Sequence, residues 1–430
     1  MRAPLSVSRT AEVGRTLLAR SGLLPANVSA GVACGLWYIF GGIPISLSVA
    51  AALRLTPDQT SSWLLITCLT GAVSGLGLSL HYRQPLAITM SIPGWVLLAT
   101  IGPRFSFPEI VGANLVAGAL ILLLGLLGVG ERVMAWLPLP IVMGMFAGSI
   151  IAYGSGIFTQ MGIQPLLVGP PVAAFLVARA ARRSWLPPMA AAVVVGLLAA
   201  ALPGHVNLEG LAWRPPVLTL TAPRFSPEAV LELALPLSVM TVGIGNVQGL
   251  GLLISKGYRP PIKLATVVVG VNSLINAAFG GNQASIARNG IAILAAEDAG
   301  PVERRYVANV VATLFLLLLV VNAATASSLL RVVPVGLVTA LAGLAILSSL
   351  LDALQRAVSG QLPFGALFAL IVAASPLQFL GIGSAFWALV AGLMTSLLVE
   401  RDQLLNAWRS AKSPGRKRSI QPETSRRSPA

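Results

Sequence analysis

The sequence predicts an all-α polytopic membrane protein with about fourteen transmembrane segments. Of its 430 residues, 56% are hydrophobic and 10% charged, and the mean hydropathy is +0.83. This composition leaves too little polar surface for a water-soluble protein of that length. Apolar runs of roughly 17–25 residues recur, which is the length of a helix that spans a bilayer core. They lack the alternation of barrel strands, so helices are favoured.

The predicted segments are separated by short polar loops, with a Pro-rich loop between the two halves. In order they cover about 26–52, 62–80, 86–102, 111–127, 138–153, 165–178, 189–202, 229–254, 264–279, 280–296, 307–329, 336–351, 364–380 and 385–399. The first contains Gly41, Gly42 and Pro44, which predict a kink.

Charge predicts the orientation. The net charge is +15, and most of the 29 Lys and Arg residues fall in cytoplasmic loops or the C-terminal tail if the N-terminus is inside. The exceptions are Arg54, Arg104, Arg214, Arg224, Arg331 and, within a segment, Arg288. This distribution favours a bacterial inner-membrane protein with both termini cytoplasmic over a nucleic-acid-binding protein. No cleaved signal peptide is expected.

The two halves each hold seven segments, so the second half is expected to enter the membrane inverted. The third segment of each half is interrupted, at Gln84–Gly94 and at Phe279–Gly290. Paired interruptions at corresponding places predict the binding site of an inverted-repeat transporter. Two ordinary kinked helices are the alternative. As half-helices, their N-termini would favour an anion.

Arg288 lies in mid-segment, where a charge costs several kcal/mol unless it is compensated. Its forked guanidinium suits a carboxylate, which makes it the leading candidate for substrate contact. A structural role, with bonds to backbone carbonyls of the other broken segment, stays open.

Further candidates for substrate binding are small polar groups and aromatic rings near the two broken segments. They are Asn282, Gln283, Ser285, Asn289, Ser91, Gly94, Asn246, Gln248, Trp37, Tyr38 and Trp95. Helix–helix hydrogen bonding is the alternative for each polar group, and core packing or lipid contact for each ring.

No enzyme, cofactor or metal motif is found. Cys34 and Cys68 lie in apolar runs, and His81 and His205 are far apart. There is no P-loop, and the Gly-rich stretch Gly243–Gly249 predicts close helix packing. No deep acidic residue is expected either, since Glu232 lies near the outer end of the eighth segment and Asp352 ends the twelfth.

Several stretches together resemble the benzoate:proton symporter (BenE) family, over about residues 25–400. They are Leu78–Pro85 through Pro93–Gly94, Lys256–Pro261, Phe279–Gly281 and Arg304–Tyr306. This family is related to nucleobase and sulfate transporters that have a seven-plus-seven inverted-repeat fold. Nucleobase relatives carry carboxylates where this chain has Gly245–Asn246 and Arg288. The change from acid to base favours an anion, and sulfate-transporter relatives are also basic there.

The resemblance implies a division into a core domain and a gate domain, with the substrate between the third and tenth segments. The implied units are a core 25–128 and 227–329 and a gate 129–204 and 330–399. Charge and composition predict the remaining segments: a cytoplasmic segment 1–24, an extracytoplasmic loop 205–226 and a basic disordered tail 400–430. Relatives also suggest a homodimer through the gate domain.

The leading hypothesis is alternating-access, proton-coupled import of benzoate or another aromatic carboxylate. Arg288 and the half-helix N-termini would hold the carboxylate, and Trp37, Tyr38 or Trp95 would flank the ring. The alternatives are an inorganic-anion or nucleobase carrier of the same fold and an anion channel. A membrane-embedded enzyme is disfavoured, because no nucleophile–base or metal pair is present.

Overall fold

A computed structural model describes residues 23–128, 138–181, 187–202, 213–380 and 382–412. The first half contains helices α2 (Pro25–Trp37), α3 (Ile43–Ala52), α4 (Pro57–Tyr82), α5 (Ile92–Ile101), α6 (Phe107–Leu127), α8 (Leu139–Ile163), α9 (Pro165–Ala181) and α10 (Pro188–Ala201), with strand β1 (Ile88–Met90) before α5. A π-helical turn, Tyr38–Gly42, joins α2 to α3 where the kink was predicted.

The second half follows the same succession of a long interrupted helix, a helix, a short strand and a short helix. It contains α11 (Pro227–Ala229), α12 (Leu235–Val239), α13 (Val247–Ser255), α14 (Ile262–Ala278), β2 (Ala284–Ile286), α15 (Arg288–Leu294), α16 (Tyr306–Val321), α17 (Ala323–Val332), α18 (Val335–Val358), α19 (Pro363–Ala374), β3 (Gln378–Phe379), β4 (Ile382–Gly383), α20 (Ser384–Val399) and α21 (Arg401–Lys412). Two π-helical segments, Val230–Ala234 and Met240–Asn246, join α11, α12 and α13 into one continuous helix.

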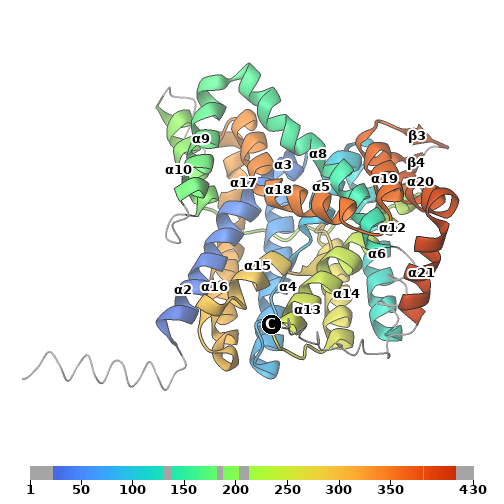
Figure 1. Ribbon diagram of the computed structural model, residues 1–430. Coiled ribbons are helices and arrows are strands. Elements are labelled where there is room, and N and C mark those ends of the chain that lie inside the picture. The colour runs from blue at the N-terminus through green and yellow to red at the C-terminus, as the bar shows by residue number, and fades with distance from the viewer. Residues whose placement is uncertain (1–22, 129–137, 182–186, 203–212, 381, 413–430) are drawn as a thin grey trace, which may run out of the picture.

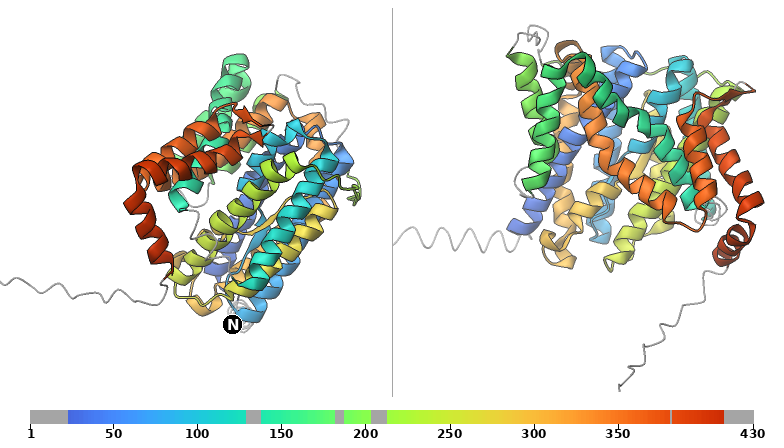
Figure 2. Two further views of the ribbon diagram at one scale, coloured as in Figure 1. Left: turned by 90° about the vertical axis from the view of Figure 1, so that its right-hand side faces the viewer. Right: turned by 45° about the horizontal axis from the view of Figure 1, so that its top comes forward.

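The helices form two groups (Figures 1 and 2). In one, α14 packs along α6, and α16 packs on α2 and α4. In the other, α18 and α19 pack on α8, α19 packs on α20, and α9 packs on α10. Small residues permit the closest approaches: a side chain at Gly144 or Gly148 of α8 would overlap backbone of α19. The largest contacts between the groups are those of α3 with α18 and of α5 with α8.

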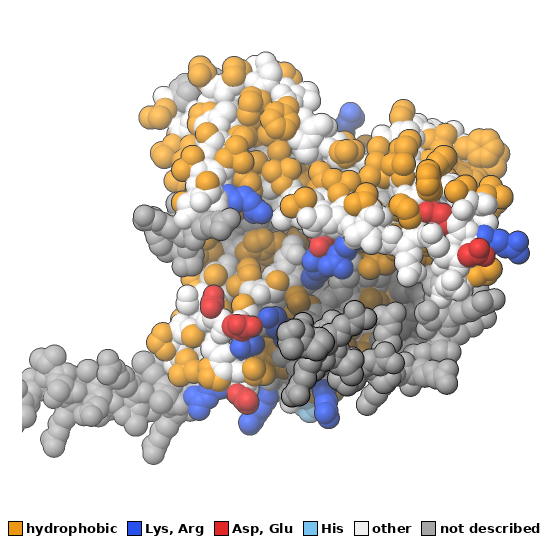
Figure 3. Space-filling model, in the orientation of Figure 1, with side chains coloured by type: hydrophobic (Ala, Val, Ile, Leu, Met, Phe, Trp, Pro, Cys, Tyr) orange, Lys and Arg blue, Asp and Glu red, His pale blue; other side chains and the backbone are white. Residues whose placement is uncertain are grey.

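Within the described residues, seven helices are long and apolar enough to cross a membrane, and five further apolar helices are shorter. Large apolar side chains such as Leu166 and Leu198 are exposed. Figure 3 shows apolar side chains spread over one face of the molecule. An all-α membrane protein is therefore confirmed. The count of fourteen spans and the inverted repeat stay predictions.

The structure differs from the predicted segments near the C-terminus. The twelfth segment, predicted to end at Leu351, continues as α18 to Val358, so Asp352 lies inside a helix. The eleventh divides into α16 and α17 at Asn322. Residues 401–412, predicted as part of a disordered tail, form α21, because Leu404 is buried against the membrane helices. Residues 413–430 lie outside the described residues, as do residues 1–22.

Candidate functional site

The two interrupted segments meet through their strands. β1 and β2 pair antiparallel, with Ile88 opposite Ile286, Thr89 opposite Ser285 and Met90 opposite Ala284. Beyond the strands, the Ser91 N–H donates to the Gln283 carbonyl and the Ala287 N–H to the Ala87 carbonyl, each at 2.9 Å. Extended backbone deep in a membrane protein must find partners within the protein. The crossing satisfies this need and ties together segments nearly 200 residues apart.

A short helix starts immediately after each strand. The Ser91 hydroxyl accepts from the Gly94 N–H at 3.2 Å and so caps α5. α15 begins at Arg288, whose side chain enters a cavity beside the crossing. Close packing was predicted against another helix at Gly243–Gly249. The structure shows it at Gly245 and Gly249 against strand β2 instead, since a side chain at either position would overlap Ser285 or Ile286.

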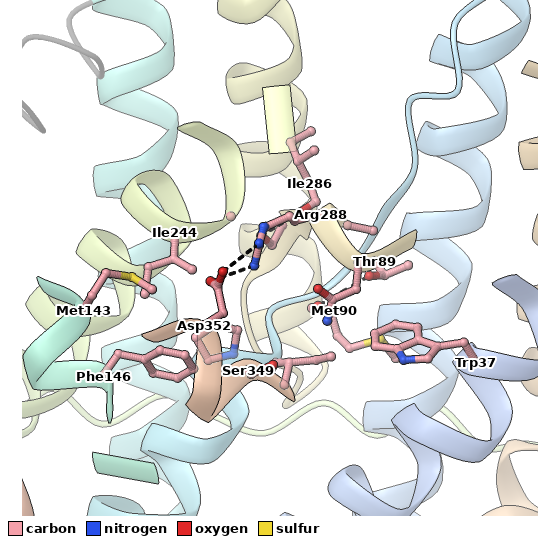
Figure 4. Close-up of a pocket in the computed structure, with 16 residues that line it drawn as sticks. Trp37, Thr89, Met90, Met143, Phe146, Ile244, Ile286, Arg288, Ser349 and Asp352 are labelled. Atoms are coloured by element: carbon pink, nitrogen blue, oxygen red, sulfur yellow. Dashed lines mark hydrogen bonds and ion pairs between the residues drawn. The ribbon is translucent and has the colours of Figure 1, made fainter. Parts of the chain in front are cut away.

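The cavity lies between the two helix groups, next to the strand crossing (Figure 4). Its volume of about 60 Å³ is room for a few water molecules. Trp37, Met90, Met143, Phe146 and Ile244 supply apolar walls. The polar lining residues are Thr89, Ser285, Arg288, Asn289, Ser349 and Asp352. In Figure 3 this face of the molecule is hollowed between the groups, and charged side chains gather at the edge of the hollow.

Arg288 and Asp352 form an ion pair across the cavity. Arg288 Nη1 donates to Asp352 Oδ2 at 2.9 Å, and Nη2 donates to Oδ1 at 3.0 Å. Arg356, one turn further along α18, donates from Nε to both oxygens of the same carboxylate at 3.0 Å. The side chains of Arg288, Asp352 and Arg356 are 29%, 24% and 38% exposed. Of the three, Arg288 and Asp352 line the cavity, so both keep some exposed surface there.

A family model described as "Benzoate membrane transport protein" matches residues 22–398, nearly the whole membrane part of the chain. This chain belongs to the BenE family. It is 31% identical over 354 residues to the inner membrane protein YdcO of Escherichia coli (strain K12), covering 81% of this chain and 90% of that relative. It is 28% identical over 361 residues to the benzoate membrane transport protein of Acinetobacter baylyi (strain ATCC 33305 / BD413 / ADP1), covering 84% and 91% respectively. As a BenE-family member it is a membrane transport protein and not an enzyme.

Solved structures with the same fold are far more distant in sequence. The transmembrane domain of the cyanobacterial bicarbonate transporter BicA matches with a TM-score of 0.53 and 15% identity, over 89% of this chain and 97% of that one. The structure of SLC26A9 matches with a TM-score of 0.60 and 14% identity, over 94% and 72% respectively. At such identities the likeness shows that this BenE-family chain shares their fold, and no more.

Four of the residues predicted to bind substrate line the cavity of this BenE-family protein. They are Trp37, Ser285, Arg288 and Asn289. Arg288 bonds a carboxylate, as its forked geometry predicted, but the carboxylate belongs to the chain itself. The structural alternative predicted that the Arg288 side chain bonds backbone carbonyls. Its described side-chain hydrogen bonds go to Asp352 instead.

A second set of predicted residues is buried around the strand crossing instead. Asn282 donates to the Ser91 carbonyl at 3.1 Å and accepts from Trp63 Nε1 at 3.4 Å. Gln283 donates to Asn114 Oδ1 at 2.9 Å. Trp95 is fully buried and meets Trp63 edge-to-face at 5.9 Å between centroids. These contacts position the crossing, and none of these residues lines the cavity.

The remaining predicted residues lie close by. Tyr38 is buried behind Trp37, in T-shaped contact with it at 5.9 Å. Asn246 accepts from the Ile286 N–H at 3.3 Å, which fixes β2 to the π-helical segment. Gln248 Nε2 lies 3.6 Å from the sulfur of Met143, a cavity residue. Gly94 lies in the first turn of α5, held by Ser91.

Sequence reasoning missed Asp352, Ser349, Met143, Phe146 and Ile244. Asp352 carried a usable signal: it is acidic, it follows an apolar run, and Arg356 lies four residues later, which is the spacing of an ion pair on one helix face. The apolar residues carried no signal, because they resemble any lipid-facing or core position. Among the described residues, no group of three or more His, Cys, Asp or Glu side chains gathers that could hold a metal ion.

Proposed function

We propose that this BenE-family protein is a secondary active transporter that imports benzoate or a related aromatic monocarboxylate by alternating access. The observation that carries the proposal is the doubly hydrogen-bonded Arg288 guanidinium at a cavity whose other walls are mostly apolar. A fork–fork pair with a carboxylate combines charge and geometric selection. The ring of an aromatic acid would then lie against Trp37, Phe146 and Ile244.

The proposed movement is between a core of residues 25–128 and 227–329 and a gate of residues 129–204 and 330–399. Helices of the two units pack chiefly within their own group, which supports this division. The cavity lies at the boundary, with Arg288 on the core side and Asp352 on the gate side. Its volume of about 60 Å³ is small for an aromatic ring, so the proposed movement separates the groups to admit one. A homodimer through the gate stays a prediction.

Coupling to protons, import as the direction, and cytoplasmic termini are parts of the proposal that rest on the family resemblance and the charge distribution. Accumulation of labelled benzoate in proteoliposomes under an inward-directed proton gradient, abolished by an uncoupler, is the expected result. Uptake that does not depend on the proton gradient would contradict proton coupling, but it would leave the proposed binding site in place.

The Arg288 site predicts a defined mutational pattern. Arg288→Gln should reduce benzoate uptake on the order of 100-fold, because the substrate carboxylate loses its charged partner in a partly desolvated site. Arg288→Lys should recover only part of the activity, since an ammonium lacks the planar fork. Initial uptake rates in proteoliposomes measure both.

Arg259→Gln is the matched control, because Arg259 lies exposed in the loop between α13 and α14. It should transport like the wild type. Benzoate uptake by folded Arg288→Gln at the wild-type rate would sink the assignment.

An inorganic-anion carrier is the second candidate, favoured by the small volume of the cavity. Inhibition of benzoate uptake by bicarbonate or sulfate would indicate an inorganic-anion carrier, and inhibition by uracil would indicate a nucleobase carrier. Saturation and counterflow distinguish a carrier from an anion channel.

A further inference from the structure

Asp352 occupies the position on Arg288 that a carboxylate ligand would take. Both of its oxygens accept from different terminal nitrogens of the guanidinium, at 2.9 and 3.0 Å. Figure 4 shows the two side chains pointing toward each other across the cavity, one from α15 and one from α18. This is the two-bond arrangement by which arginine recognises carboxylates in general. An external carboxylate and Asp352 therefore cannot both use these two donors.

Arg356 provides a second place for the Asp352 carboxylate. Its Nε already donates to both oxygens at 3.0 Å, from the same helix and one turn away. If Arg288 turned to another anion, Asp352 would keep an ionic partner. The three side chains are about a quarter to two-fifths exposed, so exchanging one charged partner for another costs little desolvation.

The charges around the cavity select for a single negative charge. Arg288 and Asp352 are the charged side chains among the described lining residues, and Arg356 is bonded directly behind Asp352. Two guanidinium groups and one carboxylate leave one positive charge. A monocarboxylate neutralises it, whereas a dicarboxylate would leave an unpaired negative charge in a mostly apolar cavity, which is costly.

We propose that Asp352 is an internal competitor for Arg288, displaced onto Arg356 when a monocarboxylate binds. This inference rests on the proposed function, since it takes Arg288 as the substrate-binding group. The inference adds that Asp352 sets the affinity of the site for carboxylates and its preference for singly charged ones. Because the displaced bond joins α15 to α18, substrate binding removes an ion pair between the proposed core and gate, which frees them to move.

The test measures binding of benzoate and of isophthalate, a dianion at neutral pH, to purified protein by calorimetry. Asp352→Asn keeps the side-chain volume and removes the competing charge. We expect its Kd for benzoate to fall roughly fivefold, and its Kd for isophthalate to fall by a larger factor. Arg356→Gln should weaken benzoate binding, because the displaced carboxylate loses its second partner.

Glu297→Gln is the matched control, because it removes a carboxylate 3.9 Å from Lys256, 89% exposed and outside the cavity. It should leave both Kd values unchanged. Suppose that Asp352→Asn binds benzoate no better than wild type while Arg288→Gln still abolishes binding. The proposed role of Asp352 as an internal competitor is then overturned, and the proposed function stands.

A second measurement needs no ligand. A double-mutant cycle of Arg288→Gln and Asp352→Asn is followed by thermal unfolding in detergent. The two shifts in Tm should be non-additive, because each single change breaks the same ion pair. Additive shifts in Tm would overturn the proposed competition between Asp352 and the ligand. Failure of the wild type to bind any tested carboxylate is a separate result, and it would contradict the proposed function.

Discussion

At the residue scale, some of the charged side chains of the described membrane region form ion pairs. Asp352 lies between Arg288 and Arg356, and Glu232 pairs with Arg104 at 2.6 Å. The Glu232 side chain is fully buried, whereas Arg104 is 31% exposed. Such pairs are expensive to build in an apolar surrounding, and removing one partner leaves an uncompensated charge. The two pairs differ in position, since Arg288 and Asp352 line the cavity and Arg104 and Glu232 do not.

Arg104→Ala is predicted to destabilise the protein by about 2–3 kcal/mol, because it leaves the buried Glu232 carboxylate without its cation. A lowered unfolding temperature in detergent measures this effect. The control is Arg214→Ala, in an exposed loop, which should unfold like wild type. Equal stability of both variants would contradict the role given to the Arg104–Glu232 pair.

At the scale of elements, the strand crossing is the part that positions the site. β1 and β2 pair over only three residues each, so their alignment depends on what packs around them. Asn246 bonds the backbone of β2, Asn309 bonds the Leu86 carbonyl just before β1 at 3.3 Å, and Gln283 bonds Asn114 of α6. The crossing therefore fixes where α5 and α15 begin, and with them the place of Arg288.

Gly245→Ala is predicted to shift β2 away from the π-helical segment. The added methyl group would overlap the Ser285 hydroxyl, and it would still lie 3.1 Å from the Ser285 Cβ if the hydroxyl rotated away. We expect benzoate uptake to fall at least tenfold, since misplacement of binding groups by about 1 Å has effects of that order or larger. Uptake per folded molecule in proteoliposomes measures it.

Gly251→Ala, in the same continuous helix, is the control. A methyl group added at Gly251 would meet nothing within 4 Å, so this change should be tolerated. Wild-type uptake by Gly245→Ala would show that the close approach to β2 does not matter for transport.

At the scale of the whole molecule, the helices form two packed groups (Figure 1). The cavity lies between them (Figure 4). Each group is held by close helix contacts, while the Arg288–Asp352 pair bridges them with exchangeable polar bonds. This arrangement suits the proposed movement of the two groups around the proposed binding site, as alternating access requires.

Ser349→Cys is predicted to place a thiol in the cavity that reacts with a small water-soluble maleimide, and benzoate should slow that reaction by occupying the cavity. The native thiols Cys34 and Cys68 are buried and should stay silent. Glu297→Cys, outside the cavity, is the control whose labelling benzoate should leave unchanged. Equal effects of benzoate on both thiols would argue against ligand occupancy beside Ser349.

The sequence by itself determined the membrane class, and it predicted the two interrupted segments and a binding role for Arg288. These follow from local physics: the length of apolar runs, the local effect of glycine and proline, and the cost of a charge in mid-segment. The Gly-rich stretch Gly243–Gly249 was likewise interpretable, because missing side chains signal a close neighbour.

Only the tertiary structure decided what those residues meet. Asp352 faces Arg288 although the two are 64 positions apart. Asp352 lies on α18 because this helix continues beyond its predicted end at Leu351. Asn282, Gln283 and Trp95, equal candidates by sequence, are used to hold the strand crossing. Polar and aromatic residues look alike in sequence whether they pack or bind, because the difference depends on which side of a packed segment faces the cavity.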